Sequence, residues 1–277
     1  MSRYGIEDLR ELMRRLRDPQ SGCPWDLRQD HASLLEHTLE EVYEFADAVA
    51  RADDAAMRDE LGDYLFQAVF HAQVAAERGA FDFGDVTDAI VAKLLRRHPH
   101  VFPDGTLGAR RDPQARVEVH EVRADWERAK QEERGRRALH GVLDDVPLAL
   151  PALPRAAKLQ RRAAAVGFDW PEVSGVIAKL HEEIAELEQA RAGADAVAIA
   201  DELGDLLFSC VNLARHLGVD AESALRQANA KFEARFRALE QEVRRRGLAW
   251  EDCSEGVLDA IWEAVKHGER GERGADG

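Results

Sequence analysis

The sequence has few of the features that build sheets, disulfide frameworks or membrane spans. It contains 9 prolines and 3 cysteines in 277 residues, and Val/Ile/Thr/Tyr runs of the kind that form strands are scarce. Ala, Leu, Glu and Arg dominate instead, which is typical of helical proteins. Because Cys23, Cys210 and Cys253 are odd in number and show no metal-type spacing, we expect reduced thiols.

Long apolar runs and an excess of basic residues are also missing. No stretch approaches the ~18 apolar residues that a membrane span requires, and the amphipathic N-terminus does not resemble a signal peptide. We therefore expect a cytoplasmic protein without a membrane partner. The formal net charge of −15 argues against nucleic acid as a partner, although it also suits an ordinary solvated surface. It does not exclude nucleotides, because divalent cations can lie between an acidic protein and a triphosphate.

Internal similarity indicates that the chain is a duplication. Residues 40–69 and 182–211 match at 16 of 30 positions without a gap, and Asp-Glu-Leu-Gly-Asp recurs intact at 59–63 and 201–205. At shifted offsets, Lys93-Leu94-x-x-Arg97 corresponds to Lys231-Phe232-x-x-Arg235, and Trp126-Glu127-x-x-Lys130 to Trp262-Glu263-x-x-Lys266. A shared Ala-rich composition would not repeat acidic, basic and aromatic positions in the same order.

The repeat predicts an all-α protein made of tandem duplicated helical-bundle domains. We expect an N-terminal domain at 1–134, a charged and Pro-rich connector at 135–154, a C-terminal domain at 155–267 and a disordered Gly-rich tail at 268–277. Helices are predicted near 31–51, 54–78, 84–97 and 116–133, and again near 172–192, 196–217, 220–247 and 254–267. Asp169 is a predicted helix start, and Gly193, Gly218 and Gly247 are predicted stops.

Two consecutive helices of the second copy carry an acidic pattern, Glu182-Glu183-x-x-Glu186 and then Glu202-x-x-Asp205. Acids three residues apart lie ~60° apart on a helix, and Glu183 and Glu202 fall only ~60–70° from the centres of the apolar stripes. The stripes, which we expect to be buried, are Val176, Leu180, Ile184 and Leu187, and Ile199, Leu203, Leu206, Cys210 and Ala214. If the helices pack antiparallel through these stripes, four carboxylates converge at the edge of the interface.

Converging carboxylates repel one another unless cations compensate, and oxygen-only ligands favour Mg²⁺ or Mn²⁺ over zinc. A solvated acidic helix face is the ordinary alternative. A ferritin-like di-iron site would need Glu-x-x-His pairs, which these helices lack. What favours the metal site is recurrence, because the first copy repeats the five acids with identical spacing as Glu40, Glu41, Glu44, Glu60 and Asp63.

Basic residues accompany the acidic pattern. Lys179 lies one turn before Glu183 on the same face, and Lys231 and Arg235 project together at positions i and i+4. Each alone is typical of a surface cation, whereas the set favours contacts with phosphate. Trp262 fits either stacking on a base or packing in a core or interface.

The histidines are not expected to be ligands. We read His98 and His100 as a helix-ending turn, because Pro99 and Pro103 break the chain there. We read His71 and His216 as ordinary helix residues.

Together these motifs resemble the MazG family of nucleotide pyrophosphohydrolases. The resemblance is carried by Glu-Glu-x-x-Glu, Glu-Leu-Gly-Asp, Lys-Phe-x-x-Arg and Trp-Glu-x-x-Lys, with GFDWP at 167–171 and RRHPHVF at 96–102. It covers nearly the whole chain. The acidic motif alone is shared with all-α dUTP and phosphoribosyl-ATP pyrophosphohydrolases, so only the full set points to this family.

The resemblance implies an intertwined homodimer that converts nucleoside triphosphates to monophosphates and pyrophosphate, with Mg²⁺ or Mn²⁺ as cofactor, in housecleaning of the nucleotide pool. A metal-activated water would attack the α phosphorus. By position, the implied metal ligands are Glu183, Glu186, Glu202 and Asp205, joined by Glu182 in the catalytic set. The implied nucleotide contacts are Lys179, Glu182, Lys231, Arg235 and Trp262.

The first copy departs from this pattern at His37, which stands where the second copy has Lys179. A histidine is mostly neutral at pH 7 and supplies less charge to a phosphate. We therefore expect the C-terminal copy to be the main site, with a possible second site at Glu40, Glu41, Glu44, Glu60, Asp63, Lys93 and Arg97. Two alternatives stay open: a narrow dUTP-type pyrophosphohydrolase, and a non-catalytic helical dimer that binds nucleotide or a protein partner.

Overall fold

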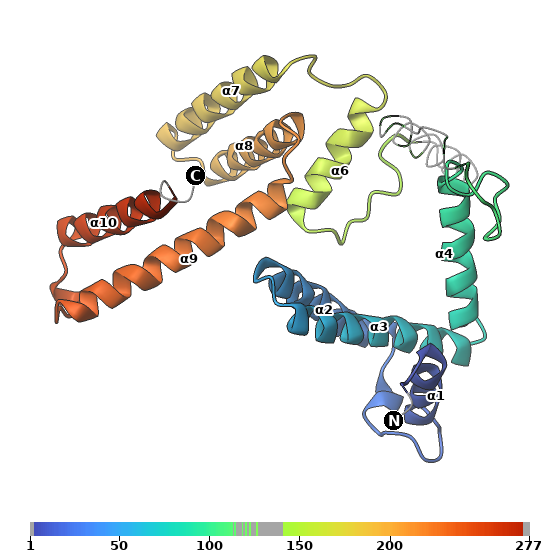
Figure 1. Ribbon diagram of the computed structural model, residues 1–277. Coiled ribbons are helices and arrows are strands. Elements are labelled where there is room, and N and C mark those ends of the chain that lie inside the picture. The colour runs from blue at the N-terminus through green and yellow to red at the C-terminus, as the bar shows by residue number, and fades with distance from the viewer. Residues whose placement is uncertain are drawn as a thin grey trace. The chain divides into compact units, whose positions relative to one another are not determined.

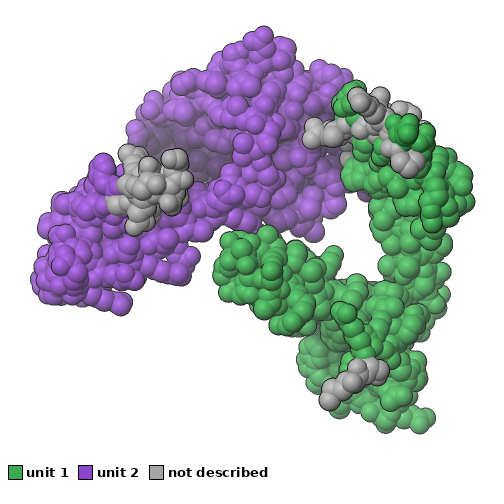
Figure 2. Space-filling model, in the orientation of Figure 1, with its two compact units in different colours: residues 1–134 green, residues 135–277 purple. Residues whose placement is uncertain are grey.

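The computed structural model describes residues 3–112, five single positions from 114 to 126, and residues 141–273. Every regular element in this part of the chain is a helix (Figure 1). The chain divides into two compact units, residues 1–134 and 135–277 (Figure 2), and each unit holds one copy of the repeat. The predicted all-α duplicated fold is thereby confirmed.

The N-terminal unit is built on a hairpin of two long helices, α2 (His31–Ala50) and α3 (Asp54–Glu77). Helices α1 (Ile6–Leu16) and α4 (Phe83–Arg97) both pack against α3, and the 3₁₀ turn η1 (Asp26–Arg28) leads into α2. Carboxylates of Asp30, Asp53 and Asp82 accept backbone N–H groups at the starts of α2, α3 and α4. Such caps satisfy donors that a helix leaves unpaired at its N-terminus.

The C-terminal unit repeats the plan around α7 (Val173–Ala192) and α8 (Ala196–His216). Helix α6 (Ala152–Ala164) packs against α8 and α9 (Ala221–Arg245). Helix α9 then pairs with α10 (Glu255–Arg273), with the 3₁₀ turn η2 (Trp250–Asp252) between them. Asp195 and Asp220 cap α8 and α9.

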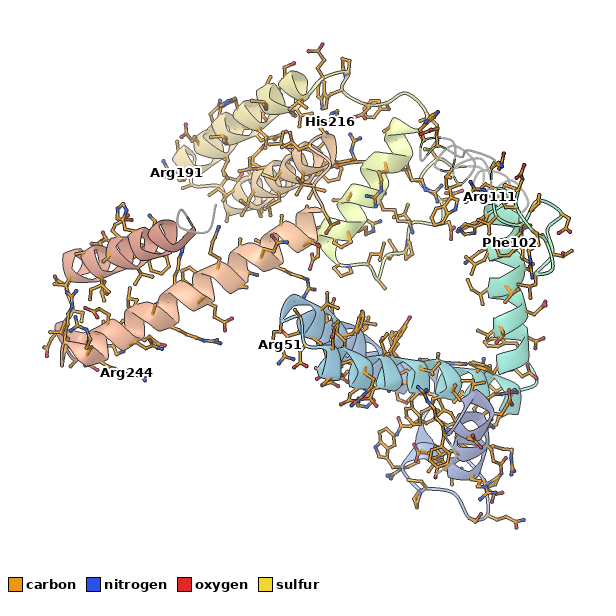
Figure 3. The ribbon with its side chains drawn as sticks, in the orientation of Figure 1. Arg51, Phe102, Arg111, Arg191, His216 and Arg244 are labelled. Carbon is orange, nitrogen blue, oxygen red and sulfur yellow. The ribbon has the colours of Figure 1, made fainter. Side chains whose placement is uncertain are left out.

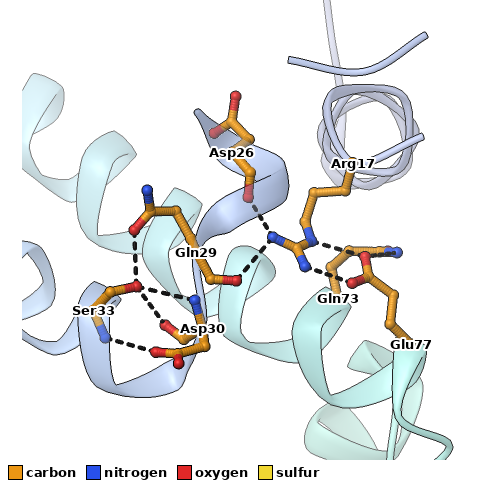
Figure 4. Close-up of polar contacts among 7 residues, drawn as sticks. All are labelled: Arg17, Asp26, Gln29, Asp30, Ser33, Gln73 and Glu77. Atoms are coloured by element: carbon orange, nitrogen blue, oxygen red, sulfur yellow. Dashed lines mark hydrogen bonds and ion pairs between the residues drawn. The ribbon is translucent and has the colours of Figure 1, made fainter. Parts of the chain in front are cut away.

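One guanidinium joins three segments of the N-terminal unit (Figure 4). Arg17, at the end of α1, donates to the Glu77 carboxylate at the end of α3 over 2.8 and 2.6 Å. It also donates to the backbone carbonyls of Asp26 and Gln29, just before α2. The hydrogen bonds from Arg17 to the Glu77 carboxylate hold the pKa of Glu77 below its usual value. The adjoining hydrophobic core consists of Met13, Leu34, Val69, Phe70 and Val74.

Both long hairpins turn through an alanine in the left-handed region. Ala52 has φ of 52° and Ala194 has φ of 53°, and the two are 142 residues apart, at the same position of the repeat. Alanine rarely adopts this conformation because its Cβ approaches the following carbonyl. The shared turn fixes which residues of the paired helices face each other.

Several predicted boundaries differ from the structure. Helix α6 begins within the predicted connector, because Pro151 and Pro154 lie at its N-cap and in its first turn, where proline is tolerated. Helix α1 was not predicted, and α10 continues past residue 268, where the disordered tail was expected to begin. Most of the predicted helix at 116–133 lies outside the described residues.

The predicted helix start at Asp169 is wrong, because α7 begins at Val173 after the N-cap Glu172. The predicted stops are confirmed, since Gly193, Gly218 and Gly247 follow the ends of α7, α8 and α9. Gly218 and Gly247 adopt φ of 69° and 66°, which only glycine adopts without strain.

No helix among the described residues is long and apolar enough to cross a membrane. The cytoplasmic location stays a prediction from the sequence.

Candidate functional site

The α7–α8 hairpin brings the acidic residues of the second copy face to face. Counted from the turn at Ala194, Glu186 and Glu202 are each eight residues away, and Glu183 and Asp205 are each eleven away. Antiparallel packing therefore sets them at two matching levels. One carboxylate oxygen from each of Glu183, Glu186 and Glu202 lies within 4.8 Å of the others. The structure thus brings together three of the four predicted carboxylates, from two helices.

Glu183 is the most buried member of this cluster, with 3% of its surface exposed. Its Oε1 accepts a hydrogen bond from Nζ of Lys179 at 2.8 Å, and Lys179 also donates to Glu182 at 2.9 Å. The other oxygen, Oε2 of Glu183, is buried without a hydrogen-bond partner among the described residues. An unpaired buried carboxylate oxygen is costly, and a cation would satisfy it. The cluster therefore fits a divalent metal ion.

The negative charges of the carboxylates in the cluster repel one another. Burial raises the pKa of the Glu202 carboxyl, and the nearby charges of Glu186 and Glu183 raise it further. Asp205 contributes to the same shift, although it lies outside the group of three. Hydrogen bonds to Glu183 and Glu182 raise the pKa of the Lys179 ammonium, so this lysine stays charged and partly neutralises the cluster.

The first copy also forms a cluster on α2 and α3, with Asp63 as its third member in place of Glu44, the counterpart of Glu186. Carboxylate oxygens of Glu41, Glu60 and Asp63 lie within 4.8 Å of one another. Burial raises the pKa of Glu41, and the charges of Asp63, Glu44 and Glu60 add to the shift. The pKa of Glu60 is raised by burial and then by Glu44. Glu60 also lines a cleft of about 640 Å³, together with Glu40, Tyr43, Glu44, Asp47 and Arg51.

The two copies differ beside the cluster as the sequence predicted. His37 stands where Lys179 stands, and its Nδ1 lies 3.6 Å from an oxygen of Glu40. The His37 ring also packs against Trp25, with 5.8 Å between ring centroids. Lys179, in contrast, forms ion pairs with two glutamates of its helix.

The remaining predicted nucleotide contacts lie on neighbouring helices. Lys231 is exposed and Arg235 half-buried on α9, which packs against α8. In the first copy, the corresponding Lys93 and Arg97 are half-buried on α4, which packs against α3.

Trp262 packs against a hydrophobic cluster formed by Leu239, Val243 and Ile261. Its ring centroid lies 5.5 Å from that of Phe232, the neighbour of Lys231. These contacts support the reading of Trp262 as a packing residue, and its contact with nucleotide stays a prediction.

The predicted buried stripes are partly wrong. Ile184 and Leu203 are 44% and 45% exposed, and Cys210 is exposed too, whereas Glu183, the neighbour of Ile184, is buried. The hairpin contact therefore follows the line of Val176, Leu180, Glu183 and Leu187, all buried or half-buried. Each helix has apolar residues on two faces, and periodicity alone does not say which face meets the hairpin partner.

His216, and the pair His31 and His71, make side-chain contacts that the sequence did not predict. Asp169 accepts hydrogen bonds from Arg215 and lies 3.0 Å from Nε2 of His216. The Arg215 hydrogen bonds are the main reason that the pKa of Asp169 is lowered to about 2. In the first copy, Nδ1 of His31 lies 3.0 Å from Nδ1 of His71, and burial lowers the pKa of His71.

The other histidine prediction concerned the end of α4. His98 is the C-cap of that helix, and its Nδ1 bonds to the carbonyl of Leu94 at 2.7 Å. The predicted helix-ending turn is confirmed.

The model of the MazG nucleotide pyrophosphohydrolase domain matches this chain twice, over residues 29–102 and 172–239. Each match contains one complete carboxylate hairpin. The chain belongs to the MazG family. The two MazG matches also include Lys93, Arg97, Lys231 and Arg235, while Trp262 lies beyond the second match.

Full-length relatives agree with this membership. The chain is 49% identical over 266 residues to the nucleoside triphosphate pyrophosphohydrolase of Escherichia coli K12, covering 95% of this chain and 98% of the relative. It is 42% identical over 271 residues to the nucleoside triphosphate pyrophosphohydrolase/pyrophosphatase MazG of Thermotoga maritima, covering 97% and 99%. The crystal structure of a MazG-related protein from T. maritima is 28% identical, with a TM-score of 0.37, and covers 46% of this chain and 99% of that one. This TM-score is too low to bear on the fold.

We predict that Glu202→Gln stabilises the metal-free protein. Folding raises the pKa of Glu202, so its ionised form destabilises the fold above the folded-state pKa. This penalty disappears as the pH falls below the unfolded-state pKa. At neutral pH the neutral amide should therefore raise Tm. Mg²⁺ should raise the Tm of the wild type more than that of the variant, because a ligand of the native state stabilises it and the variant keeps only the carboxylate cluster of the first copy intact.

Thermal unfolding with and without Mg²⁺ measures both effects. Glu188→Gln, which changes an exposed glutamate of the partner helix α7, is the control. A Mg²⁺-dependent shift in Tm that Glu202→Gln leaves intact would contradict the assignment of Glu202 to the metal site.

Proposed function

We propose that this protein is a nucleoside triphosphate pyrophosphohydrolase that cleaves between the α and β phosphates. The proposal is supported by its membership of the MazG family and by the names of its full-length relatives. The observation that carries it is the carboxylate cluster around the buried Oε2 of Glu183, which has no hydrogen-bond partner within the described ranges of the chain. A helical scaffold without chemistry would have no reason to hold such a group in its hairpin.

Within this proposal, Glu183, Glu186, Glu202 and Asp205 hold Mg²⁺ or Mn²⁺. Hard divalent cations prefer such all-oxygen ligand sets. When bound, an ion of this kind polarises phosphate oxygens and lowers the pKa of a coordinated water. Glu183 is buried and Asp205 is exposed, so a triphosphate would approach the metal from the side of Asp205.

Lys179 is already placed beside the cluster as a charged ammonium. In the metal-free protein it neutralises Glu182 and Glu183. Once Glu183 binds metal, Lys179 can donate to phosphate oxygens while Glu182 still orients it. Lys231 and Arg235 would add two cations one turn apart on α9.

We further propose that the protein is a homodimer. Both hairpins expose an apolar face whose side chains are 41–52% exposed, whereas a helix face in contact with water normally carries polar side chains. In the first copy these are Leu35, Leu39, Val42, Val49, Leu61 and Leu65, and in the second Ile177, Ile184, Leu203 and Leu207. Two such hairpins would bury these faces by forming a four-helix bundle.

The expected products from a nucleoside triphosphate and Mg²⁺ are the monophosphate and pyrophosphate. In ¹⁸O-labelled water, attack at the α phosphorus should place the label in the monophosphate, which mass spectrometry detects. Activity should vanish with EDTA and return with Mg²⁺ or Mn²⁺. Release of orthophosphate as first product, or full activity after exhaustive EDTA dialysis, would contradict the proposal.

The two copies should contribute unequally to turnover. Glu183→Ala and Asp205→Ala should lower turnover by orders of magnitude, and Glu41→Ala and Asp63→Ala should have smaller effects. The reason is that His37 supplies less charge than Lys179, a difference of one charge–phosphate contact worth about 1–3 kcal/mol, or roughly 5- to 150-fold in affinity.

Both pairs of variants are to be assayed at saturating Mg²⁺ on the same substrates, with folding checked by circular dichroism. Loss of activity in Glu41→Ala with normal activity in Glu183→Ala would reverse the ranking. A loss of about half in each set would show equivalent copies.

Dimerisation should depend on the exposed apolar face. Leu203→Glu places a charge in that face and should shift the protein towards the 30.9 kDa mass of one chain in light scattering coupled to gel filtration. The matched control is Val197→Glu, at a position on the same helix that is 80% exposed. A wild type that runs as a monomer at micromolar concentration would refute the dimer.

A further inference from the structure

A pocket of about 450 Å³ lies at the open end of the α7–α8 hairpin, within the range of small-molecule sites. Figure 3 labels His216 at this end and Arg191 near the opposite end, at the turn. The pocket is enclosed by α6, α8, the 167–170 loop and Leu143. The carboxylates of the metal cluster are not among its lining residues, so the pocket is a separate feature of the described part of the C-terminal unit.

The first copy fills the corresponding place with hydrophobic core. Leu-Met-Arg-Arg at 12–15 of α1 corresponds to Leu-Gln-Arg-Arg at 159–162 of α6, and Phe70 of α3 corresponds to Asn212 of α8. Met13 and Phe70 are both fully buried, at 0% exposure. The second copy has Gln160 and Asn212 at these positions, and both line the pocket. Replacing two large core side chains by amides leaves space and costs stability, so an occupant would explain the exchange.

Gln160 presents an unused acceptor. Its side chain is 7% exposed, and its Nε2 donates to the carbonyl of Phe208 at 2.8 Å. That bond fixes the orientation of the amide, because a flipped amide would face one oxygen with another. Its Oε1 is buried and has no hydrogen-bond partner among the residues that the structure describes. A buried acceptor of this kind needs a donor, which an ordered water or a bound molecule can supply.

Arg215 presents an unused donor on the same wall. Its terminal nitrogens donate to Asp169 and to Oδ1 of Asn212, at 2.9 and 2.7 Å. These bonds hold the guanidinium in place, while its Nε is buried and unpartnered within the described part of the chain. The pocket therefore offers one fixed acceptor and one fixed donor.

The remaining walls are aromatic. Phe168, Trp170 and Phe208 line the pocket and are 81%, 43% and 43% exposed. Trp170 lies against α7 at Gly175, where an added Cβ would stand 3.1 Å from the indole ring. A flat heterocycle can stack on such walls while its polar edge meets the donor and acceptor.

The pocket also lies at a suitable place along α8. Asn212 is seven residues beyond Asp205, which is ~10.5 Å along the axis and within ~20° of the same face. In a nucleotide the sugar separates the α phosphate from the base. With its phosphates at the carboxylates, a nucleotide is long enough for its base to reach this end of the hairpin.

We propose that this pocket binds the nucleobase of the substrate, with Gln160 Oε1 accepting a hydrogen bond from a base N–H and Arg215 Nε donating one to a base acceptor. This assignment rests on the proposed function for the identity of the substrate. The pocket thereby makes Gln160 a specificity-determining residue of the C-terminal copy.

The test compares wild type with Gln160→Met, which restores the residue of the first copy and removes the acceptor. Turnover is measured on the four ribonucleoside triphosphates and on base-free ribose 5-triphosphate. Binding of the four nucleosides without metal is measured by calorimetry. Gln160→Met should lower kcat/KM on the preferred nucleotide by about 10- to 100-fold, mainly through KM. It should leave the base-free substrate unchanged, abolish nucleoside binding and raise Tm.

Gln241→Met, at an exposed position of α9, is the control and should behave as wild type. Asn212→Phe, which restores Phe70 of the first copy and fills the pocket, is the second variant should Gln160→Met fail to fold. It should abolish nucleoside binding in the same way.

The outcomes separate this proposal from the proposed function. Hydrolysis of nucleotides by both variants with wild-type kcat/KM on every base would overturn the pocket and leave the hydrolase intact. An equal loss on nucleotides and on base-free ribose triphosphate would also overturn it. Nucleoside binding that Gln160→Met abolishes, in a protein that hydrolyses no triphosphate, would support the pocket for a free nucleoside and refute the hydrolase.

Discussion

The structure depends on the register of two antiparallel helices joined by a turn too short to let them slip. Ala194 turns the chain in a left-handed conformation, and Ala52 does the same in the first copy. Equal spacing on either side of the turn then sets Glu186 opposite Glu202 and Glu183 opposite Asp205. Like charges face each other in a partly buried place, and the raised pKa of Glu202 records the cost. A site that holds such repulsion is suited to a cation.

The two copies have kept this register and have diverged around it. In the second copy an ammonium stands beside the cluster, and amides stand where the first copy has its largest core residues. In the first copy the imidazole of His37 replaces the ammonium, and Met13 and Phe70 close the core. Both differences favour the second copy as the proposed nucleotide site. The first copy keeps its carboxylates but gains a tighter core, joined through Arg17 to Glu77.

The apolar surface follows from the same geometry. Each hairpin helix carries apolar residues on two faces. The line through Glu183 meets the other helix of the hairpin, and the line through Ile184 is left exposed. This arrangement keeps the carboxylates inside the hairpin contact, where their separation is set by backbone packing. It leaves the second face exposed, and the proposed dimer would use that face without moving the acids.

The sequence by itself determined the helical class, the duplication, the acids of each cluster and the substitution of His37 for Lys179, because these follow from periodicity and from repeated residue types. It did not determine which apolar face of α7 and α8 meets the hairpin partner, since both faces have helical spacing. Nor did it show the pocket at Gln160. From sequence, a glutamine in an Arg-rich helix looks like a surface residue. Only the packing of α6 against α8 buries it, and there its amide nitrogen donates a hydrogen bond to the carbonyl of Phe208. Burial and hydrogen-bond partners come from segments far apart in the chain, so only the tertiary structure decided them.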